Sequence, residues 1–319
     1  MNTDISIDDI RGAAERIKSI ARRTPVLTSR TFNTLAGGPT FFKCENFQRG
    51  GAFKIRGASN FVYSIPKDDL PRGVVSYSSG NHAQAVAIAA ASVDIPATIV
   101  MPADAPKSKL EATRGYGAKV VTYDRMLGSR ETIGRKIAEE TGATLVPPYD
   151  HPWIIAGQGT AALELLEEVP DLDTLVVCIG GGGLMSGCAI AAKALRPNIR
   201  IFGVEPADAN DTYLSFRARE RIEIPMPLTI ADGLRATKPG ELTFAIMQKH
   251  VEEVILVSDK EIRDTMRFLL TRMKMLVEPS GAVAAAALFD HKLPKGLGKT
   301  GVIVSGGNVD LEFFQTVWD

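Results

Sequence analysis

The feature that most constrains the fold of this 319-residue chain is a regular alternation of short apolar runs with helix-compatible segments. Apolar runs of this kind recur at short intervals between residues 74 and 146. Near-continuous apolar strands separated by helices are typical of a parallel sheet with right-handed crossover connections. The expected strands are 74–78, 97–101, 119–123 and 144–146, and the expected helices between them are 81–91, 106–116 and 126–140.

The same alternation resumes near residue 151 and predicts a second, larger α/β unit. Its expected strands are 40–44, 174–179, 200–204, 254–257 and 302–305. Its expected helices are 6–22, 53–63, 151–168, 183–195, 241–250, 260–275 and 280–288, and 210–221 is expected to be partly helical. We therefore expect a large domain of residues 1–67 and 151–319, into which a small domain of residues 68–150 is inserted. The default ligand site of such a fold is the cleft at the carboxyl ends of its strands.

Charge and apolar content exclude several classes of partner. Lys+Arg and Asp+Glu both number 37, so the formal net charge is zero, and neither sign forms a block. This balance argues against nucleic acid or an anionic membrane as the main partner. No apolar run approaches the length of a membrane span, and the first residues lack the features of a secretory signal. With Cys44, Cys178 and Cys188 in apolar contexts, we expect a cytoplasmic protein with buried, reduced thiols.

The most specific motif is the run of four glycines, Gly180, Gly181, Gly182 and Gly183, between an expected strand and an expected helix. Glycine lets the backbone approach an anion closely, and a helix N-terminus presents free N–H groups to it. The motif lacks the Lys-Ser/Thr pair of a nucleotide P-loop and the G-x-G-x-x-G spacing of a dinucleotide site. It predicts a phosphate cradle; the alternative is a tight strand–helix turn.

Further polar motifs also follow expected strands. Lys54 comes after two glycines, the run Ser78-Ser79-Gly80-Asn81-His82 opens a helix, and Ser305 begins a glycine-rich loop. Taken singly, these could be a surface lysine, a helix cap and a turn. Together they provide an amine, a carboxylate-binding loop and a hydroxyl near a phosphate cradle. That combination fits pyridoxal 5′-phosphate, with Lys54 as the Schiff-base lysine.

These motifs closely resemble the serine racemase and serine–threonine dehydratase family, whose fold is fold type II of the pyridoxal-phosphate enzymes. The resemblance covers nearly the whole chain. It includes 53–58, 78–84, 155–160, 180–184, 229–233, 278–280 and 305–310. It implies two open, mostly parallel α/β domains of the tryptophan synthase β-like type, with the cofactor in the cleft between them.

The resemblance also implies roles for individual residues. Lys54 would hold the cofactor and then act as the base at Cα, and Ser79 would be the acid or base on the opposite face. Substrate would contact Ser78, Ser79, Asn81 and His82. The cofactor-binding residues would be Phe53, Lys54, Asn81, Gly180, Gly181, Gly182, Gly183, Leu184 and Ser305. A hydroxyl at Ser305, unlike a carboxylate, cannot stabilise a charged ring nitrogen, and this favours elimination over transamination.

A divalent-cation site is implied at the run 205–211. Its ligands would be the carboxylates of Glu205 and Asp211 and the carbonyl of Ala209. Hard oxygen ligands completed by water suit Mg²⁺, or else Ca²⁺ or Mn²⁺. The alternative is a pair of solvated surface acids.

Two positions depart from the pattern of serine racemases. Ala52 stands where a serine is often found, and Ala236 replaces a serine that helps to hold the substrate, with Arg235 beside it. The chain is therefore more similar to the subgroup that acts on 3-hydroxyaspartate, whose second carboxylate needs a cation. Arg130 and Arg235 are the candidates, because arginine binds carboxylates through two parallel hydrogen bonds. Surface ion pairs are the alternative for both.

We therefore expect a lyase that removes water from a 3-hydroxy amino acid, most simply 3-hydroxyaspartate, giving iminosuccinate and then oxaloacetate and ammonia. The alternatives are a serine or threonine ammonia-lyase, a serine racemase and a catalytically silent amino-acid sensor. The resemblance implies a homodimer with a small amino acid as substrate.

Overall fold

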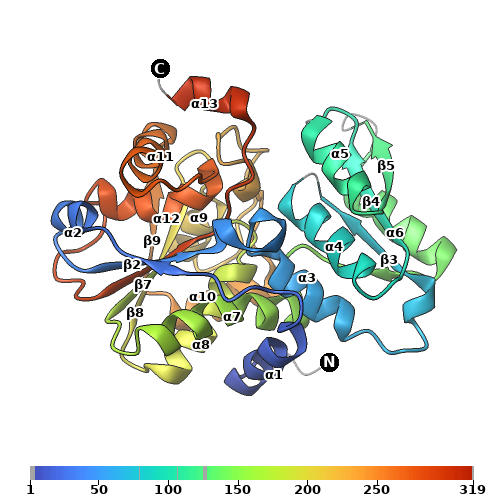
Figure 1. Ribbon diagram of the computed structural model, residues 1–319, viewed down its shortest axis with the longest axis horizontal. Coiled ribbons are helices and arrows are strands. Elements are labelled where there is room, and N and C mark those ends of the chain that lie inside the picture. Colours follow the sequence, from blue (N-terminus) through green and yellow to red (C-terminus); the bar gives the residue numbers. More distant parts are fainter. Residues whose placement is uncertain (1–3, 79, 106, 125–127, 318–319) are drawn as a thin grey trace.

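The computed structural model describes residues 4–78, 80–105, 107–124 and 128–317, and it contains two α/β units that lie side by side (Figure 1). Within these residues, the larger unit is built on a six-stranded sheet of order β1-β2-β10-β7-β8-β9. Its strands are β1 (Val26–Leu27), β2 (Thr40–Cys44), β7 (Thr174–Cys178), β8 (Arg200–Pro206), β9 (Glu253–Val257) and β10 (Thr300–Val304).

The strands of the large sheet are parallel except at one edge. There, β1 pairs with β2 in the antiparallel direction, and the other pairs found in the described ranges are parallel. Strand β10 lies between β2 and β7, with Val304 opposite Cys44. The carboxyl ends of these three strands therefore meet at the same edge of the sheet, although they are far apart in the sequence.

Helices cover both faces of the large sheet (Figure 1). On one side, α7 packs against α1 and α8, and α8 packs against α10; on the other, α12 packs against the strands and α11. The helices of this unit are α1 (Ile7–Ile17), α2 (Arg30–Ala36), α7 (Pro152–Glu168), α8 (Gly183–Leu195), α9 (Asp211–Ala218), α10 (Glu241–His250), α11 (Asp259–Met273), α12 (Pro279–Phe289) and α13 (Leu311–Val317).

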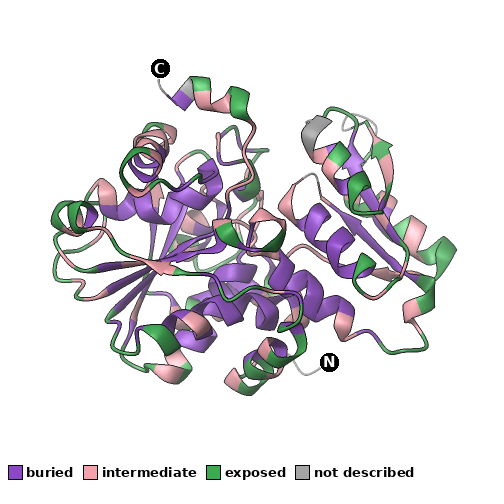
Figure 2. Cartoon of the chain, viewed as in Figure 1, coloured by how far each residue is buried: buried purple, intermediate pink, exposed green. Residues whose placement is uncertain are grey.

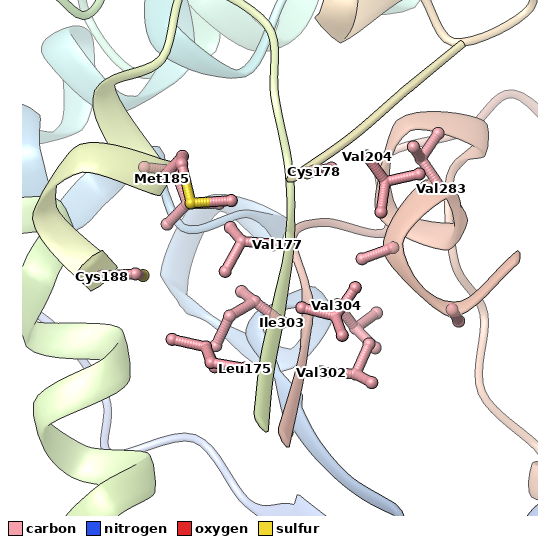
Figure 3. Close-up of a cluster of buried hydrophobic side chains, with 14 of the residues drawn as sticks. Leu175, Val177, Cys178, Met185, Cys188, Val204, Val283, Val302, Ile303 and Val304 are labelled. Atoms are coloured by element: carbon pink, nitrogen blue, oxygen red, sulfur yellow. The ribbon is translucent and has the colours of Figure 1, made fainter. Parts of the chain in front are cut away.

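The central strands are apolar on both faces because helices cover both. Along β7 and β10, successive side chains point to opposite sides (Figure 3). Leu175 and Ile303 face Met185 of α8, and Val304 faces Val283 of α12. Figure 2 shows the same strands buried along their whole length, whereas the outer helix faces and the loops carry most of the exposed residues. This is the burial expected of a parallel sheet.

The smaller unit has a four-stranded parallel sheet in the described part of the chain, of order β5-β4-β3-β6. Its core also takes in Ile17, Ile55, Phe61 and Ile154, so α3 and the end of α1 pack on the small unit as well. The elements of this unit are β3 (Val74–Tyr77), β4 (Ala97–Pro102), β5 (Lys119–Tyr123), β6 (Thr144–Leu145), α4 (Asn81–Ala91), α5 (Lys107–Gly115) and α6 (Arg130–Thr141). Helix α3 (Lys54–Tyr63) lies between the units and packs against both α4 and α7.

The expected order of strands and helices is found, with ends that shift by a few residues. The helix expected over 6–22 is α1, which ends at Ile17, and the strand expected over 200–204 continues to Pro206. Among the α-helices and strands of the described residues, β1, α2 and α13 were not predicted from the sequence. The three cysteines are free and buried, as expected. Among the residues that the structure describes, no helix is both long and apolar enough to cross a membrane.

Candidate active site

Three motifs singled out in the sequence follow three adjacent strands. The Lys54 segment follows β2, Ser305 follows β10, and the glycine run follows β7. The backbone joins the first two directly, because the Phe53 N–H donates to the Ser305 carbonyl at 3.0 Å and Ala52 forms a bridge with Gly306. The fold thus assembles an amine, a hydroxyl and a glycine loop at the carboxyl edge of the large sheet.

Lys54 is the first residue of α3 and lies where the two units meet. Its Nζ donates to the Pro148 carbonyl at 3.0 Å and lies 5.1 Å from the centre of the Phe53 ring. The side chain keeps partial exposure, but the surrounding protein removes most of its water, and this desolvation lowers the pKa of Lys54 to about 8. A substantial neutral fraction near pH 8 makes this amine a nucleophile and a base.

The glycine run forms a loop whose conformation and surroundings require glycine. Gly182 has a φ of 92°, and α8 begins at Gly183, so its first-turn N–H groups lack partners within the helix. A Cβ on Gly181 would lie 2.3 Å from the Tyr149 ring, and one on Gly182 would lie 2.8 Å from Thr243. Leu184 is buried in the same turn. Free N–H groups at a helix N-terminus suit a phosphate, so these residues fit the predicted group.

Ser305 and Asn81 lie near the amine, on opposite units. Ser305 is buried, and its hydroxyl donates to the Ser280 carbonyl at 3.4 Å. Asn81, at the start of α4, donates to Glu278 at 2.7 Å and accepts from Asn308 at 2.9 Å. Burial, together with the charge of Asp232, raises the pKa of Glu278 to about 8. These contacts join the small unit to the large one across the site.

The predicted carboxylate loop lies at the carboxyl end of β3. Ser78 is half-buried, and its hydroxyl accepts from the Gly80 N–H at 3.3 Å. His82 is buried beside the Val146 carbonyl, and burial and the charge of Lys54 lower its pKa to about 3. His82 is therefore neutral at physiological pH. Ser79, the predicted acid or base, lies outside the described residues.

The two predicted arginines occupy different surroundings. Arg130 begins α6, which packs against β3, the strand that ends at the predicted carboxylate loop. Its charge adds, after burial and the charge of Lys54, to the lowered pKa of His82. Arg235 is exposed, and its Nε donates to the Thr229 carbonyl at 2.9 Å.

The predicted cation ligands lie together at the end of β8. Glu205 accepts the N–H groups of Thr212 and Tyr213, at 3.2 and 2.8 Å. Both oxygens of the buried Asp211 lack a partner among the described residues, and Ala209 is also buried. Burial and the charge of Asp211 raise the pKa of Glu205, and burial raises that of Asp211 to about 7. The described ranges hold no cluster of three or more His, Cys, Asp or Glu side chains suited to a metal, so this pair depends on carbonyl and water ligands.

The sequence did not single out the segment that joins β6 to α7. Pro148, Tyr149 and Asp150 contact Lys54, the glycine loop and α10 respectively. The sequence also indicated no role for Lys109 of α5, which forms an ion pair with Asp232 between the two units. A signal was available for the first group, because Tyr149 and Asp150 follow a strand end, as the predicted motifs do.

A desolvated lysine near an anion cradle, between two mostly parallel α/β units, suits a phosphorylated aldehyde cofactor that is held on the lysine. The family of pyridoxal-phosphate-dependent enzymes matches residues 17–306, and the chain belongs to it. More narrowly, it belongs to the serine racemase and hydroxyaspartate ammonia-lyase family of fold type II enzymes.

The chain is similar to relatives with different activities. It is 50% identical to L-threo-3-hydroxyaspartate ammonia-lyase of Saccharomyces cerevisiae, an alignment that covers 97% of this chain and 95% of the relative. It is 49% identical to serine racemase of Schizosaccharomyces pombe, and this alignment covers 96% of this chain and 94% of the relative. The structure of maize serine racemase superimposes with a TM-score of 0.94 at 46% identity, covering 98% and 97%. These identities confirm the fold type and the cofactor class and leave lyase and racemase as alternatives.

The lowered pKa of Lys54 predicts how cofactor uptake depends on pH. Only the neutral amine attacks an aldehyde, so the rate at which cofactor-free protein takes up pyridoxal phosphate should rise with pH and level off above about pH 8. An ordinary lysine would level off near pH 10.4. The rate is measured by the change in absorbance after mixing. In Glu278→Gln the midpoint should move lower, because the charge of Glu278 raises the pKa of Lys54. A rate that climbs steadily to pH 10 would contradict the assignment.

Proposed function

We propose that this chain is a dehydratase that eliminates water from 3-hydroxyaspartate, giving iminosuccinate and then oxaloacetate and ammonia. The observation that carries the proposal is the position of Arg130 at the start of α6, which packs against β3, the strand that leads into the predicted carboxylate loop. A dicarboxylic substrate needs a cation for its second carboxylate, and a guanidinium binds carboxylate through two parallel hydrogen bonds. The 50% identity to a relative named for this activity supports the proposal.

Bound pyridoxal phosphate would supply an electron-withdrawing ring that makes the substrate Cα–H acidic. The Lys54 amine would hold the cofactor, and the first-turn N–H groups of α8 would hold its phosphate. Once free, Lys54 Nζ would accept the Cα proton, for which a pKa of about 8 suits it. Asn81 would orient the ring from the small unit. The Ser305 hydroxyl would face the ring nitrogen, and because it carries no charge it favours loss of the β-hydroxyl.

Serine racemase is the second candidate, because a relative of that name is 49% identical over nearly the whole chain. In that reaction Lys54 and Ser79 would exchange protons with the two faces of Cα. Elimination from serine or threonine would use the same residues without a cation for a second carboxylate.

The arginines give a test of substrate choice. We expect Arg130→Ala and Arg235→Ala to lower the ratio of kcat/KM for threo-3-hydroxyaspartate to that for L-serine by roughly tenfold or more, since losing a charged hydrogen bond costs about 1.5–3 kcal/mol. Steady-state ammonia release measures both activities. Arg135→Ala is the control, because Arg135 lies on the same helix in an exposed pair with Glu131. An unchanged ratio in both variants would refute the role of the arginines.

We further propose that Glu205, Asp211 and the Ala209 carbonyl hold a divalent cation, with Mg²⁺ as the first candidate. The supporting observation is that Asp211 is buried with neither oxygen paired in the described structure, beside a second buried carboxylate. An uncompensated buried carboxylate is costly, and a cation with water ligands would offset that cost. An open pocket of about 510 Å³, lined in part by Asp208 and Asn210, adjoins the run 205–211.

The cation proposal predicts a gain in thermal stability. Adding Mg²⁺ or Ca²⁺ at 100 times its Kd should stabilise the fold by about 2.7 kcal/mol, and Asp211→Asn should abolish this response. Because the variant removes a buried charge, it should be at least as stable as the parent without cations. Asp208→Asn, an exposed neighbour, should respond like the parent. The measurement is a melting curve in chelator against a cation series, and an equal response in Asp211→Asn would reject the site.

We also propose a cytoplasmic homodimer, as the resemblance implies. Exposed apolar side chains such as Leu228, at 84% exposure, and Leu311, at 79%, are available for such a contact. Sedimentation equilibrium gives the mass directly, and a monomer at micromolar concentration would contradict the proposal.

A further inference from the structure

The segment that leads from β6 into α7 touches three parts of the site. Pro148 accepts the hydrogen bond from Lys54, and the Tyr149 ring occupies the space that a side chain on Gly181 would need. Asp150, the next residue, turns its carboxylate to the N-terminus of α10. Consecutive residues therefore connect the amine, the glycine loop and a helix that no sequence motif assigned to the site.

Asp150 caps α10 from outside the helix. Its two oxygens accept the N–H groups of Glu241 at 2.9 Å and Thr243 at 3.0 Å, two of the donors that a helix start leaves unpaired. The residue before the helix, Gly240, has no side chain to do this, and a Cβ there would lie 2.4 Å from the Asp150 carboxylate. The cap fixes the first turn of α10, and with it Thr243.

Thr243 then holds the glycine loop. Its hydroxyl donates to the Gly181 carbonyl at 2.8 Å, and its own carbonyl accepts from Ser186 of α8 at 3.1 Å. A peptide unit is planar and trans, so a carbonyl of Gly181 held toward Thr243 points the N–H of Gly182 away from α10. The loop thus presents one of its N–H groups in a fixed direction.

We infer that Thr243 and Asp150 are positioning residues for the phosphate cradle, and that they set its affinity for the phosphate group of the cofactor. Neither is assigned a contact with the cofactor; Thr243 acts through the Gly181 peptide, and Asp150 acts through Thr243. The inference rests on the cofactor class and is independent of the proposed substrate.

A comparison of two cofactor forms separates positioning from general stability. Cofactor-free protein is titrated with pyridoxal phosphate and with pyridoxal, which keeps the aldehyde but lacks the phosphate. We expect Thr243→Val to raise the Kd for pyridoxal phosphate by about tenfold, which corresponds to the upper end of the free energy that one hydrogen bond contributes. The Kd for pyridoxal should rise by less than about twofold. Asp150→Ala should act in the same direction, and Thr243→Ser, which keeps the hydroxyl, should restore the parent values.

The matched control is Ser29→Ala, which removes the cap of α2 at the far end of the large sheet (Figure 1). It should lower the melting temperature without changing either Kd. The inference is overturned if Thr243→Val weakens both cofactor forms equally, or if it leaves the Kd for pyridoxal phosphate at the parent value.

Discussion

Lys54→Ala is expected to lower turnover by about 10²–10⁴-fold from loss of the general base alone, and to end covalent attachment of the cofactor. The physical reason is the environment of the amine, which lies beside the Pro148 carbonyl with a pKa lowered to about 8. The variant should still fold, because it removes a cation whose desolvation costs free energy below pH 8. Borohydride reduction followed by peptide mass mapping should find the cofactor on Lys54 in the parent and on no lysine in the variant.

Lys67→Ala is the matched control, since Lys67 is exposed in the segment before β3. It should keep the parent turnover and the label on Lys54. If Lys54→Ala retained turnover within about tenfold of the parent, the general base would have to be another group.

Arg56→Met is expected to destabilise the fold by about 3–5 kcal/mol, because it leaves the buried Glu45 carboxylate without its cation. Arg56 is fully buried and forms two hydrogen bonds with Glu45, at 2.7 and 2.8 Å, and two with Glu164, at 2.7 and 2.8 Å. Lys43 also bonds Glu164, at 2.5 Å. This network ties α3 to β2 and α7 two residues after Lys54, so the variant should also weaken cofactor binding. Urea unfolding monitored by circular dichroism measures the loss.

Arg23→Ala removes an exposed pair with Glu167, in which both side chains are about half exposed, and should cost no more than about 1 kcal/mol. Arg56→Lys keeps the charge but not the planar fork, so we expect it to lie between the parent and Arg56→Met. Equal stabilities of Arg56→Met and Arg23→Ala would show that the buried network contributes little.

Local pattern was sufficient to predict most strands and most helices, and to place the glycine, Lys54 and Ser305 motifs at strand ends. The apolar runs that became β7 and β10 are buried on both faces, and the glycines after β7 lie at a helix start, as their spacing indicated. Lys54 and Ser305 could be placed in one site because motifs after parallel strands meet at one edge. Strand β1 was not predicted, because it has only two residues and so shows no detectable alternation of apolar and polar side chains.

What the sequence could not provide depends on contacts between distant segments. The cap of Asp150 on α10 spans 91 and 93 positions, and no local pattern indicates such a partner. Arg56 lies in the motif 53–58, yet its partners Glu45 and Glu164 come from separate elements. The surroundings of Arg130 also depend on a distant segment: it begins α6, which packs against β3, whereas Arg235 bonds the carbonyl of nearby Thr229. Their roles toward substrate stay predictions.

The most direct test of the proposed function measures two reactions with one enzyme preparation. Ammonia and oxaloacetate formed from threo-3-hydroxyaspartate are followed beside D-serine formed from L-serine, with products separated by chiral chromatography. We predict that kcat/KM for elimination from hydroxyaspartate exceeds that for serine racemisation by about tenfold or more. This ratio corresponds to the free energy that one charged hydrogen bond to the second carboxylate contributes. Faster formation of D-serine, with little oxaloacetate, would contradict the proposal and identify a racemase.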